Sequence, residues 1–271
     1  MMAKRLFDRA LSRNGRAFRA VAAVPVTEIL RWPDEDRQRL RLELKRLFRE
    51  AFVRMPMGEL QDWVGDYFTA PARGLQRHAL LLANDADQLA ATTLFDCGPL
   101  EGGGKTLQGI YIVDRAVAPA YQGCGLGRAM AAEILVQFQP DILMTTCTQS
   151  ASLHSWIRVV RQAFAGTFEA FPHWEQEALQ PLPPTLFELA VGAFRRLYLG
   201  VAGGAMEQVD RAVASLSPLL VRKGVYGKRY DSLPWAQRGR KDVLALALGA
   251  RPGDGILVVV LRRELRAGHH E

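Results

Sequence analysis

The sequence predicts an α/β fold, because runs typical of short strands alternate with stretches typical of amphipathic helices. The clearest example is the apolar run from Leu107 to Val117, which is followed by a glycine-rich stretch and then by an amphipathic stretch from Arg128 to Gln139. This is the pattern of a strand, a tight turn and a helix. Apolar residues make up 49% of the 271 residues and charged residues 23%. Both values are ordinary for a globular protein with a sizeable core.

The N-terminal part is expected to supply one strand and two helices. The strand lies within residues 18–30, where Pro25 would interrupt it or confine it to a sheet edge. A helix begins near Trp32, has acidic residues in its first turn and ends near Val53, and a shorter helix covers about residues 58–68. The longer helix has one apolar stripe at helical spacing, formed by Leu40, Leu44, Leu47, Phe48, Ala51 and Phe52.

The middle of the chain is expected to begin with a hairpin. Its strands are residues 78–83 and 89–95, and residues 84–87, Asn-Asp-Ala-Asp, form its turn. The predicted order up to residue 164 is β-α-α-β-β-β-α-β-α. The elements that follow the hairpin are a turn at 98–105, the strand from 107, the helix from 128, a strand at 141–148 after Pro140, and a helix at 150–164.

Residues 118–128, Ala-Pro-Ala-Tyr-Gln-Gly-Cys-Gly-Leu-Gly-Arg, are the most informative stretch. Its three glycines leave little side chain in the way, so backbone N–H groups can point at one anion at the positive end of a helix dipole. The spacing G-x-G-x-G departs from the dinucleotide-binding fingerprint. A second glycine-rich stretch, Glu101 to Thr106, precedes a strand where a Walker A loop requires a helix. We therefore expect residues 118–128 to bind a phosphate-bearing cofactor.

The loop carries a family resemblance. Gln122-Gly-Cys-Gly-Leu-Gly127 matches the pattern [QR]-x-x-G-x-[GA] and resembles the acyl-CoA pyrophosphate loop of the GNAT superfamily of N-acyltransferases. The lead-in from Val117 to Gly123 resembles the V-x-P-x-[YF]-[RQ]-G of the same family. The predicted order of elements over residues 18–164 is also the GNAT core order. The resemblance implies a GNAT-like core with a mixed sheet, and an acyl-CoA, most simply acetyl-CoA, as cosubstrate.

The chain departs from the family after residue 164, where two further strands would usually follow directly. Residues 165–215 are expected instead to form a helical insertion, with helices at 186–197 and 206–216. Residues 220–226 and 255–261 resemble the two missing strands. The expected organisation is a basic N-terminal arm, residues 1–17, and one acyltransferase domain, residues 18–271.

The resemblance also implies which residues hold the cofactor. Pantetheine would thread between the fourth and fifth strands of the family core, where backbone groups near Ala116 and Val117 would bond its amides. Ser150 could replace a helix-entry Asn that touches pantetheine. The pyrophosphate would lie on backbone N–H groups of the loop, formed by Gln122, Gly123, Cys124, Gly125, Leu126, Gly127 and Arg128, with a side-chain contact from Arg128.

The general base is less clear from the sequence. Many relatives carry a Glu four residues before the motif valine, and that position here is Val113. The neighbouring Asp114 is a candidate, although in a regular strand it would point to the opposite face. Tyr111 shares a face with Val113 and Val117 in a regular strand, so it is a second candidate or a half-buried sheet aromatic. No dedicated base is apparent, and the reaction could use ordered water.

The general acid is equally open. The family's usual Tyr on the last core helix corresponds to Ile157. His154 is a nearby polar candidate, or a surface or capping histidine. Cys147 could be a nucleophile with His154 as its base, but a buried strand cysteine is the simpler interpretation.

Charge and cysteine content bear on partners and compartment. The net charge is +7, and residues 1–54 hold 14 Lys and Arg against 7 Asp and Glu, so the excess is N-terminal. A nucleic-acid partner is not favoured, because no aromatic residues alternate with the basic ones on the helix's polar face. Three widely spaced cysteines show neither metal spacing nor a disulfide framework, and no apolar run approaches 18 residues. A cytoplasmic protein without a bound metal or membrane span is expected.

Three functions are consistent with these features. The favoured one is an acyl-CoA-dependent N-acetyltransferase that acts on a primary amine of a small molecule or protein. The second is a non-catalytic, acyl-CoA-binding or regulatory protein, since both usual acid and base positions are apolar. The third is a nucleic-acid-associated protein that uses the basic arm.

Overall fold

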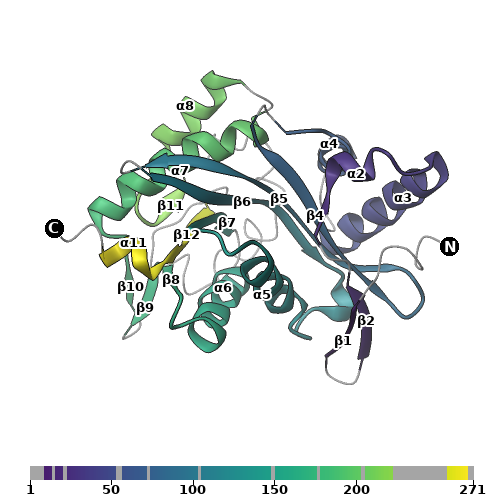
Figure 1. Cartoon of the computed structure of the whole chain (residues 1–271). Helices are drawn as coiled ribbons and strands as arrows, with labels where there is room; N and C mark the ends of the chain where they lie inside the picture. Colours follow the sequence, from purple (N-terminus) through teal and green to yellow (C-terminus); the bar gives the residue numbers. More distant parts are fainter. Residues whose placement is uncertain are drawn as a thin grey trace.

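The computed structural model describes residues 9–13, 16–20, 23–52, 57–71, 74–102, 105–147, 150–175, 178–202, 205–221 and 255–267. One mixed sheet runs through them in the order β1-β2-β4-β5-β6-β7-β12-β11, with β3 paired to β4 and β8 to β12 (Figure 1). The strands of this sheet are β1 Arg9–Arg13, β2 Arg16–Ala20, β3 Val24–Pro25, β4 Gln76–Asn84, β5 Leu89–Gly102, β6 Lys105–Val117, β7 Ile142–Cys147, β8 Phe168–Phe171, β11 Leu220–Val221 and β12 Gly255–Arg262. The predicted α/β fold with a mixed sheet is confirmed.

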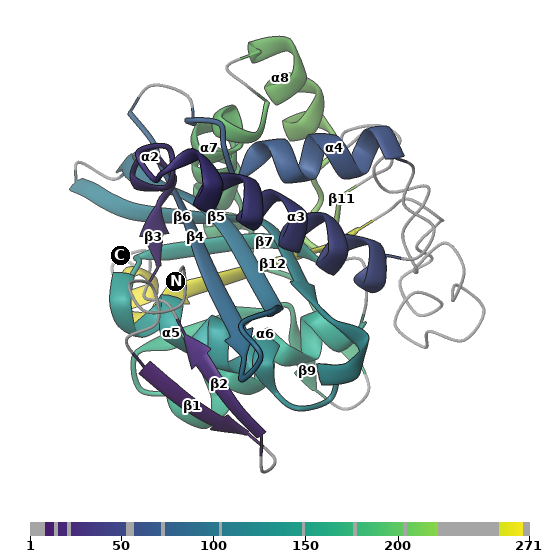
Figure 2. The same ribbon diagram turned by 90° about the vertical axis from the view of Figure 1, so that its right-hand side faces the viewer.

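Helices cover both faces of the sheet. In Figure 1, α5 and α6 lie on one face, and α2–α4 and α7–α8 lie on the other. Figure 2 shows α3 and α4 crossing the strands β4–β6. The helices are α2 Val26–Ile29, α3 Asp34–Ala51, α4 Met57–Asp66, α5 Leu126–Phe138, α6 Ser150–Ala163, α7 Pro184–Val201, α8 Met206–Ala214 and α11 Arg263–Ala267, with a 3-10 turn η1 at Pro119–Tyr121.

Three buried clusters correspond to these layers. The first joins the sheet to α5 and α6, around Trp156 and Met130. The second joins the other face to α7 and α8, around Phe194 and Leu197. The third joins that same face to α3 and α4, and it contains the apolar stripe predicted for the long helix. That helix begins, as predicted, with acidic residues in its first turn, which suits its positive N-terminal end.

The predicted hairpin of β4 and β5 is confirmed. Asn84 at its turn accepts backbone hydrogen bonds from Ala86 and Gln88 on its Oδ1 atom, which is the local chemistry that makes Asn a turn residue. The next turn is shorter than predicted, because β5 continues to Gly102 and β6 already begins at Lys105. No helix follows the glycines at 102–104, in agreement with the rejection of a Walker A loop.

The N-terminal part differs from the prediction. Residues 9–13 and 16–20 form an antiparallel hairpin, so part of the expected arm is sheet. The single strand expected within residues 18–30 is divided into β2 and β3, and the chain turns into α2 immediately after Pro25. Proline has no N–H to donate to a sheet, which explains why pairing ends there.

The C-terminal part also differs from the prediction. Residues 165–215 contain the predicted helices, as α7 and α8, but they also contain strands: β8 and the separate pair β9 His173–Glu175 and β10 Ala178–Gln180. β8 and β11 both pair antiparallel with β12, at successive stretches of that strand. The outer strand is thus interrupted, and the chain between β8 and β11 leaves the sheet and builds α7 and α8 on one face. Residues 222–226 of the predicted strand lie outside the described residues.

Candidate active site

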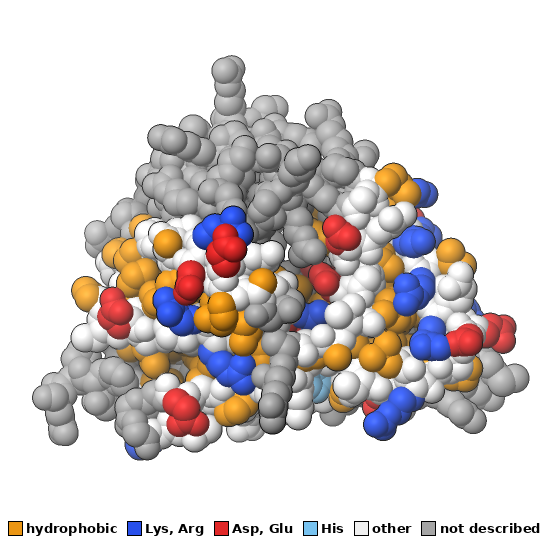
Figure 3. Space-filling model, turned by 90° about the horizontal axis from the view of Figure 1, so that it is seen from above, with side chains coloured by type: hydrophobic (Ala, Val, Ile, Leu, Met, Phe, Trp, Pro, Cys, Tyr) orange, Lys and Arg blue, Asp and Glu red, His pale blue; other side chains and the backbone are white. Residues whose placement is uncertain are grey.

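The site lies where two neighbouring parallel strands separate. β6 and β7 are paired only from Gly109–Ile142 to Ile112–Thr145. Beyond these pairs, β6 continues to Val117 and β7 to Cys147 without further pairing to each other. A cavity of about 570 Å³ occupies the opening, and both strand ends line it. Seen from above, the described surface is hollowed between the α7–α8 side and the α3–α4 side, and acidic and basic side chains both show in the hollow (Figure 3).

A β-bulge at the same point reverses the faces of β6. Leu94 of β5 pairs with Asp114, whereas the next residue, Phe95, pairs with Ile112, so Val113 is the extra residue. A bulge places two successive side chains on one face. Tyr111 packs against α7, and Asp114 bonds Tyr67 near the end of α4, so both lie on the α3–α7 face. The prediction that Asp114 points away from the face of Tyr111 and Val113 is therefore wrong.

Asp114 is a buried carboxyl group with one free oxygen. Its side chain is 9% exposed. Tyr67 Oη donates to Asp114 Oδ1 over 2.7 Å, and Thr92 Oγ1 lies 3.0 Å from Tyr67 Oη. Asp114 Oδ2 is buried and has no hydrogen-bond partner among the described residues. Burial raises the pKa of Asp114 to about 7, because desolvation outweighs the hydrogen bond from Tyr67 and the attraction of Arg77.

The glycine-rich loop has the geometry of an anion site. Gly123 and Gly125 have φ angles of 81° and 83°, a left-handed conformation that glycine adopts without strain. Gly125 precedes α5, and residues 125–128 line the cavity, so the positive dipole end of the helix lies at the cavity. The backbone N–H groups of Gln122, Cys124 and Arg128 already donate to carbonyls within the loop. A Cβ atom at Gly125 would lie 3.3 Å from Nη2 of Arg128, which shows how closely this side chain folds over the loop.

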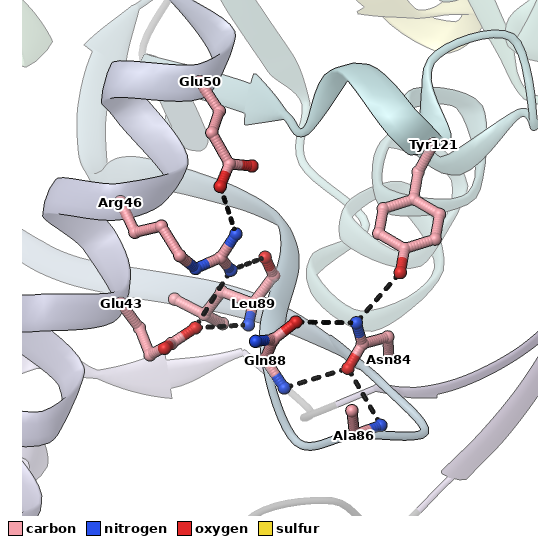
Figure 4. A network of polar contacts seen from close by, with 8 residues as sticks. All are labelled: Glu43, Arg46, Glu50, Asn84, Ala86, Gln88, Leu89 and Tyr121. Carbon is pink, nitrogen blue, oxygen red and sulfur yellow. Dashed lines mark hydrogen bonds and ion pairs between the residues drawn. The ribbon is translucent and has the colours of Figure 1, made fainter.

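The loop is anchored to the hairpin turn of β4 and β5. Asn84 Nδ2 donates to Tyr121 Oη over 2.9 Å, and the Tyr121 ring packs edge-on against Phe18 of β2. The other side of the turn is held by α3, where Arg46 donates to the Leu89 carbonyl and Glu43 accepts from the Leu89 N–H (Figure 4). These contacts fix the entry to the loop relative to the sheet. Sequence reasoning did not foresee this role for Asn84.

The charges that line the cavity are separated by sign. Arg115 faces the α5–α6 side, where its Nη1 donates to the Gly127 carbonyl and its guanidinium lies over the Trp156 ring. Among the described residues that line the cavity, every basic side chain lies on this side or on the loop. These residues are Arg115, Arg128, His154 and Arg158. The acidic ones, Asp66 and Asp114, belong to the α4 side. The cavity is therefore suited to an anion at one end and a cation at the other.

The other predicted residues have mixed positions. Ala116 and Val117 line the cavity beside the loop, and the Val117 carbonyl accepts a hydrogen bond from Gln122 Nε2 over 3.1 Å. His154 is exposed on α6 at the cavity rim. Ser150 begins α6, and its side chain lies outside the described set. Cys124 is half-buried in the loop.

The surroundings of Tyr111 and Cys147 favour a packing role in the sheet over a catalytic one. The Tyr111 ring is 2% exposed and packs edge-on against Phe194 and Tyr198 of α7. Burial raises the pKa of Cys147 to about 12, so the thiol stays protonated near neutral pH and is a poor nucleophile. Tyr67, Trp63 and Asp66 were missed, because the sequence of α4 shows only a short helix and nothing in it marks a cavity wall.

Neither a metal-binding cluster nor a membrane-spanning helix is found within the described ranges. No three His, Cys, Asp or Glu side chains there come together in a way that could hold a metal ion. None of the helices described combines the length and the apolar content needed to cross a bilayer.

Comparisons with known proteins gave matches among solved structures alone. No protein-family model matches the chain, and no curated protein sequence matches it. A probable N-acyltransferase from Enterococcus faecalis is similar over 56% of this chain and 34% of its own, at 16% identity and a TM-score of 0.34. A GCN5-related N-acetyltransferase from Kribbella flavida is similar over 47% of this chain and 29% of its own, at 19% identity and a TM-score of 0.32.

The chain thus spans about a third of the length of these two structures. A GNAT-family N-acetyltransferase from Escherichia coli, solved in complex with CoA, is similar over 55% of this chain and 67% of its own, at 19% identity and a TM-score of 0.32. The solved structures that this chain resembles therefore include GNAT-family N-acetyltransferases.

Proposed function

We propose that the chain binds an acyl-CoA, most simply acetyl-CoA, and transfers the acyl group to a primary amine. The observation that supports this most is the sign-separated cavity at the opening between β6 and β7. One end carries a glycine-rich helix N-terminus with basic side chains, which suits a pyrophosphate. The other end carries a buried carboxyl group with an unpartnered oxygen, which suits an ammonium group.

The unpaired stretch of β6 offers a place for pantetheine. Residues 114–117 of β6 pair with β5 on one edge but have no strand on the other among the described residues. Backbone groups along this free edge could bond an extended, amide-bearing chain in the manner of an added strand. The chain would lead from the pyrophosphate at Gly125 towards Asp114, which would place its thioester end at the acidic part of the cavity.

Asp114 is our proposed general base. With a pKa of about 7, it is ionised in a large fraction of molecules at neutral pH and can accept a proton from a bound ammonium group, directly or through one water. The free amine then attacks the thioester carbonyl, forming a C–N bond and breaking the C–S bond. A second amine proton passes to the departing thiolate, and Asp114 returns its proton to solvent. The described residues place no tyrosine on α6 to supply that acid.

The experiment has two arms. Isothermal titration with acetyl-CoA tests binding, and release of free thiol with a panel of primary amines tests transfer. Absence of CoA binding would contradict the whole proposal. Binding without thiol release from any amine would favour the second candidate, an acyl-CoA-binding protein without catalysis. One observation favours that candidate: the family's usual acid position is Ile157, which is apolar and 5% exposed.

A further inference from the structure

The wall of the cavity opposite the loop is aromatic and half-exposed. Phe52, just after α3, and Trp63 of α4 both line the cavity, and their ring centroids lie 5.2 Å apart at an interplanar angle of 74°. Neither ring is fully buried, although each is large. Ala51, next to Phe52, and Val201, at the end of α7, also line the cavity. An edge-to-face pair that leaves ring surface open to a cavity is suited to a flat apolar group.

Two polar atoms beside this wall lack partners among the described residues. They are Trp63 Nε1, a donor, and Asp114 Oδ2, an acceptor, and both are buried. A buried polar atom without a hydrogen bond is unfavourable, so such atoms at a cavity indicate that a ligand or water completes them. Asp114 Oδ2 is suited to the amine, and Trp63 Nε1 to a water or to an acceptor atom on a ring substituent of the ligand.

The negative charge beside this wall disfavours amines that also carry a carboxylate. The Asp66 carboxylate lines the cavity with its side chain 26% exposed, 4.0 Å from Nη1 of Arg77. Arg77 itself is engaged by Asp96 through two hydrogen bonds of 2.6 and 2.8 Å, so its charge is matched in the interior. The basic side chains that line the described cavity lie on the loop and on the α5–α6 side. Among the described lining residues, a carboxylate on the amine would therefore face Asp66 and Asp114 and meet no cation on this wall.

We propose that the acceptor is a small arylalkyl amine without a carboxylate, whose aromatic group lies on the Phe52–Trp63 wall and whose ammonium group lies at Asp66 and Asp114. This inference rests on the proposed function and narrows it to a substrate class. It places amino acids with a free carboxylate among the poor substrates. It also makes Asp66 the residue that sets this discrimination, and Phe52 and Trp63 the residues that hold the aromatic group.

The first test compares matched amines with purified protein and acetyl-CoA. 2-Phenylethylamine and phenylalanine differ by one carboxylate, and 2-phenylethylamine and ethylamine differ by the ring. We expect kcat/KM for 2-phenylethylamine to exceed that for each of the others by at least about tenfold. A lysine-containing peptide that reacts faster than 2-phenylethylamine would overturn the proposal and point to a protein acceptor.

The second test uses variants of the wall. Trp63→Leu should raise KM for 2-phenylethylamine by about tenfold or more, with the Kd for CoA unchanged. Trp63→Phe keeps an aromatic ring, and 2-phenylethylamine has no acceptor atom for the missing N–H, so KM should rise less than in Trp63→Leu. Asp66→Asn should lower the ratio of kcat/KM for 2-phenylethylamine to kcat/KM for phenylalanine. Gln61→Ala, at an exposed position of the same helix, is the control and should change neither value.

The outcomes separate this inference from the proposed function. Thiol release with phenylalanine or a peptide as the best acceptor would leave the acyltransferase proposal standing and overturn the substrate class. An unchanged amine KM in folded Trp63→Leu protein, with CoA binding intact, would overturn the aromatic wall as the acceptor site. Absence of CoA binding by the wild-type protein would contradict the proposed function itself.

Discussion

Arg77 and Asp96 form a buried ion pair that joins the sheet to two helices on one of its faces, α4 and α7. The Arg77 guanidinium donates from Nε and Nη2 to the two oxygens of Asp96, and the exposed fractions of the two residues are 4% and 0%. Nη2 also donates to the Gly200 carbonyl at the end of α7, and Nη1 lies 3.4 Å from the Asp66 carbonyl at the end of α4. One side chain therefore holds the ends of α4 and α7 against β4 and β5.

Removal of this arginine should destabilise the fold. In Arg77→Met, Asp96 would remain buried without its cation, and breaking a buried pair in this way costs about 3–5 kcal/mol. Urea unfolding should show this decrease in the free energy of unfolding. The double variant Arg77→Met/Asp96→Leu also removes the unpaired Asp96 carboxylate and should recover part of the lost free energy of unfolding. A single variant with wild-type stability would contradict the structural role of the pair.

Gly125→Glu should abolish CoA binding in a folded protein. The change places a negative side chain where an anion is expected and forces a residue with a Cβ atom into a φ of 83°. Strain of about 1–2 kcal/mol is expected from the left-handed conformation. Titration with CoA checks binding, and circular dichroism checks the fold. Gly166→Glu, which adds the same charge on an exposed turn, is the matched control. Unchanged CoA affinity in folded Gly125→Glu would rule out the loop assignment.

Tyr121→Phe tests the anchor of the loop. The change removes the hydroxyl that accepts from Asn84 Nδ2 and keeps the ring that packs on Phe18. Loss of one hydrogen bond costs about 0.5–1.5 kcal/mol. A less firmly held loop should weaken CoA binding by roughly threefold to tenfold, measured by titration at constant salt. Equal affinities would show that the hydrogen bond stabilises the hairpin turn without positioning the loop.

Local patterns in the sequence were enough to predict much of the fold. Glycine spacing, helical stripes and the Asn84 turn identified the loop, α3 and the β4–β5 hairpin, because each depends on neighbouring residues. The bulge at Val113 depends on the pairing of β5 with β6, so a strict alternation of faces misplaced Asp114. β8 is only four residues long and pairs with a strand about 90 residues later, and no local pattern reports such a partner. The approach of Asp66 to Asp114 at the cavity could not be predicted for the same reason, because α4 and β6 meet only in the folded chain.

Asp114→Asn should reduce turnover and raise stability at alkaline pH. Loss of the base should lower kcat by about 10²–10⁴-fold, measured by thiol release. The pKa of Asp114 is about 7 in the folded protein and near 4 when unfolded, so the folded state binds more protons between these values and stability falls as pH rises through 7. Asn carries no charge, so the variant should be more stable than wild type at pH 8, by up to roughly 4 kcal/mol. A lower melting temperature at pH 8 would contradict the raised pKa.

Tyr67→Phe should shift the acidic limb of the pH–activity profile to higher pH. The Tyr67 hydroxyl stabilises the ionised form of Asp114, so its removal raises the pKa of Asp114 above about 7. A plot of kcat/KM against pH should shift to higher pH by roughly one unit, with activity largely recovered at pH 9. A merely structural role would lower activity equally at every pH. Tyr198→Phe, a buried tyrosine on α7, is the matched control and should leave the limb in place. An unshifted limb in Tyr67→Phe would mean that a group other than Asp114 controls the reaction's pH dependence.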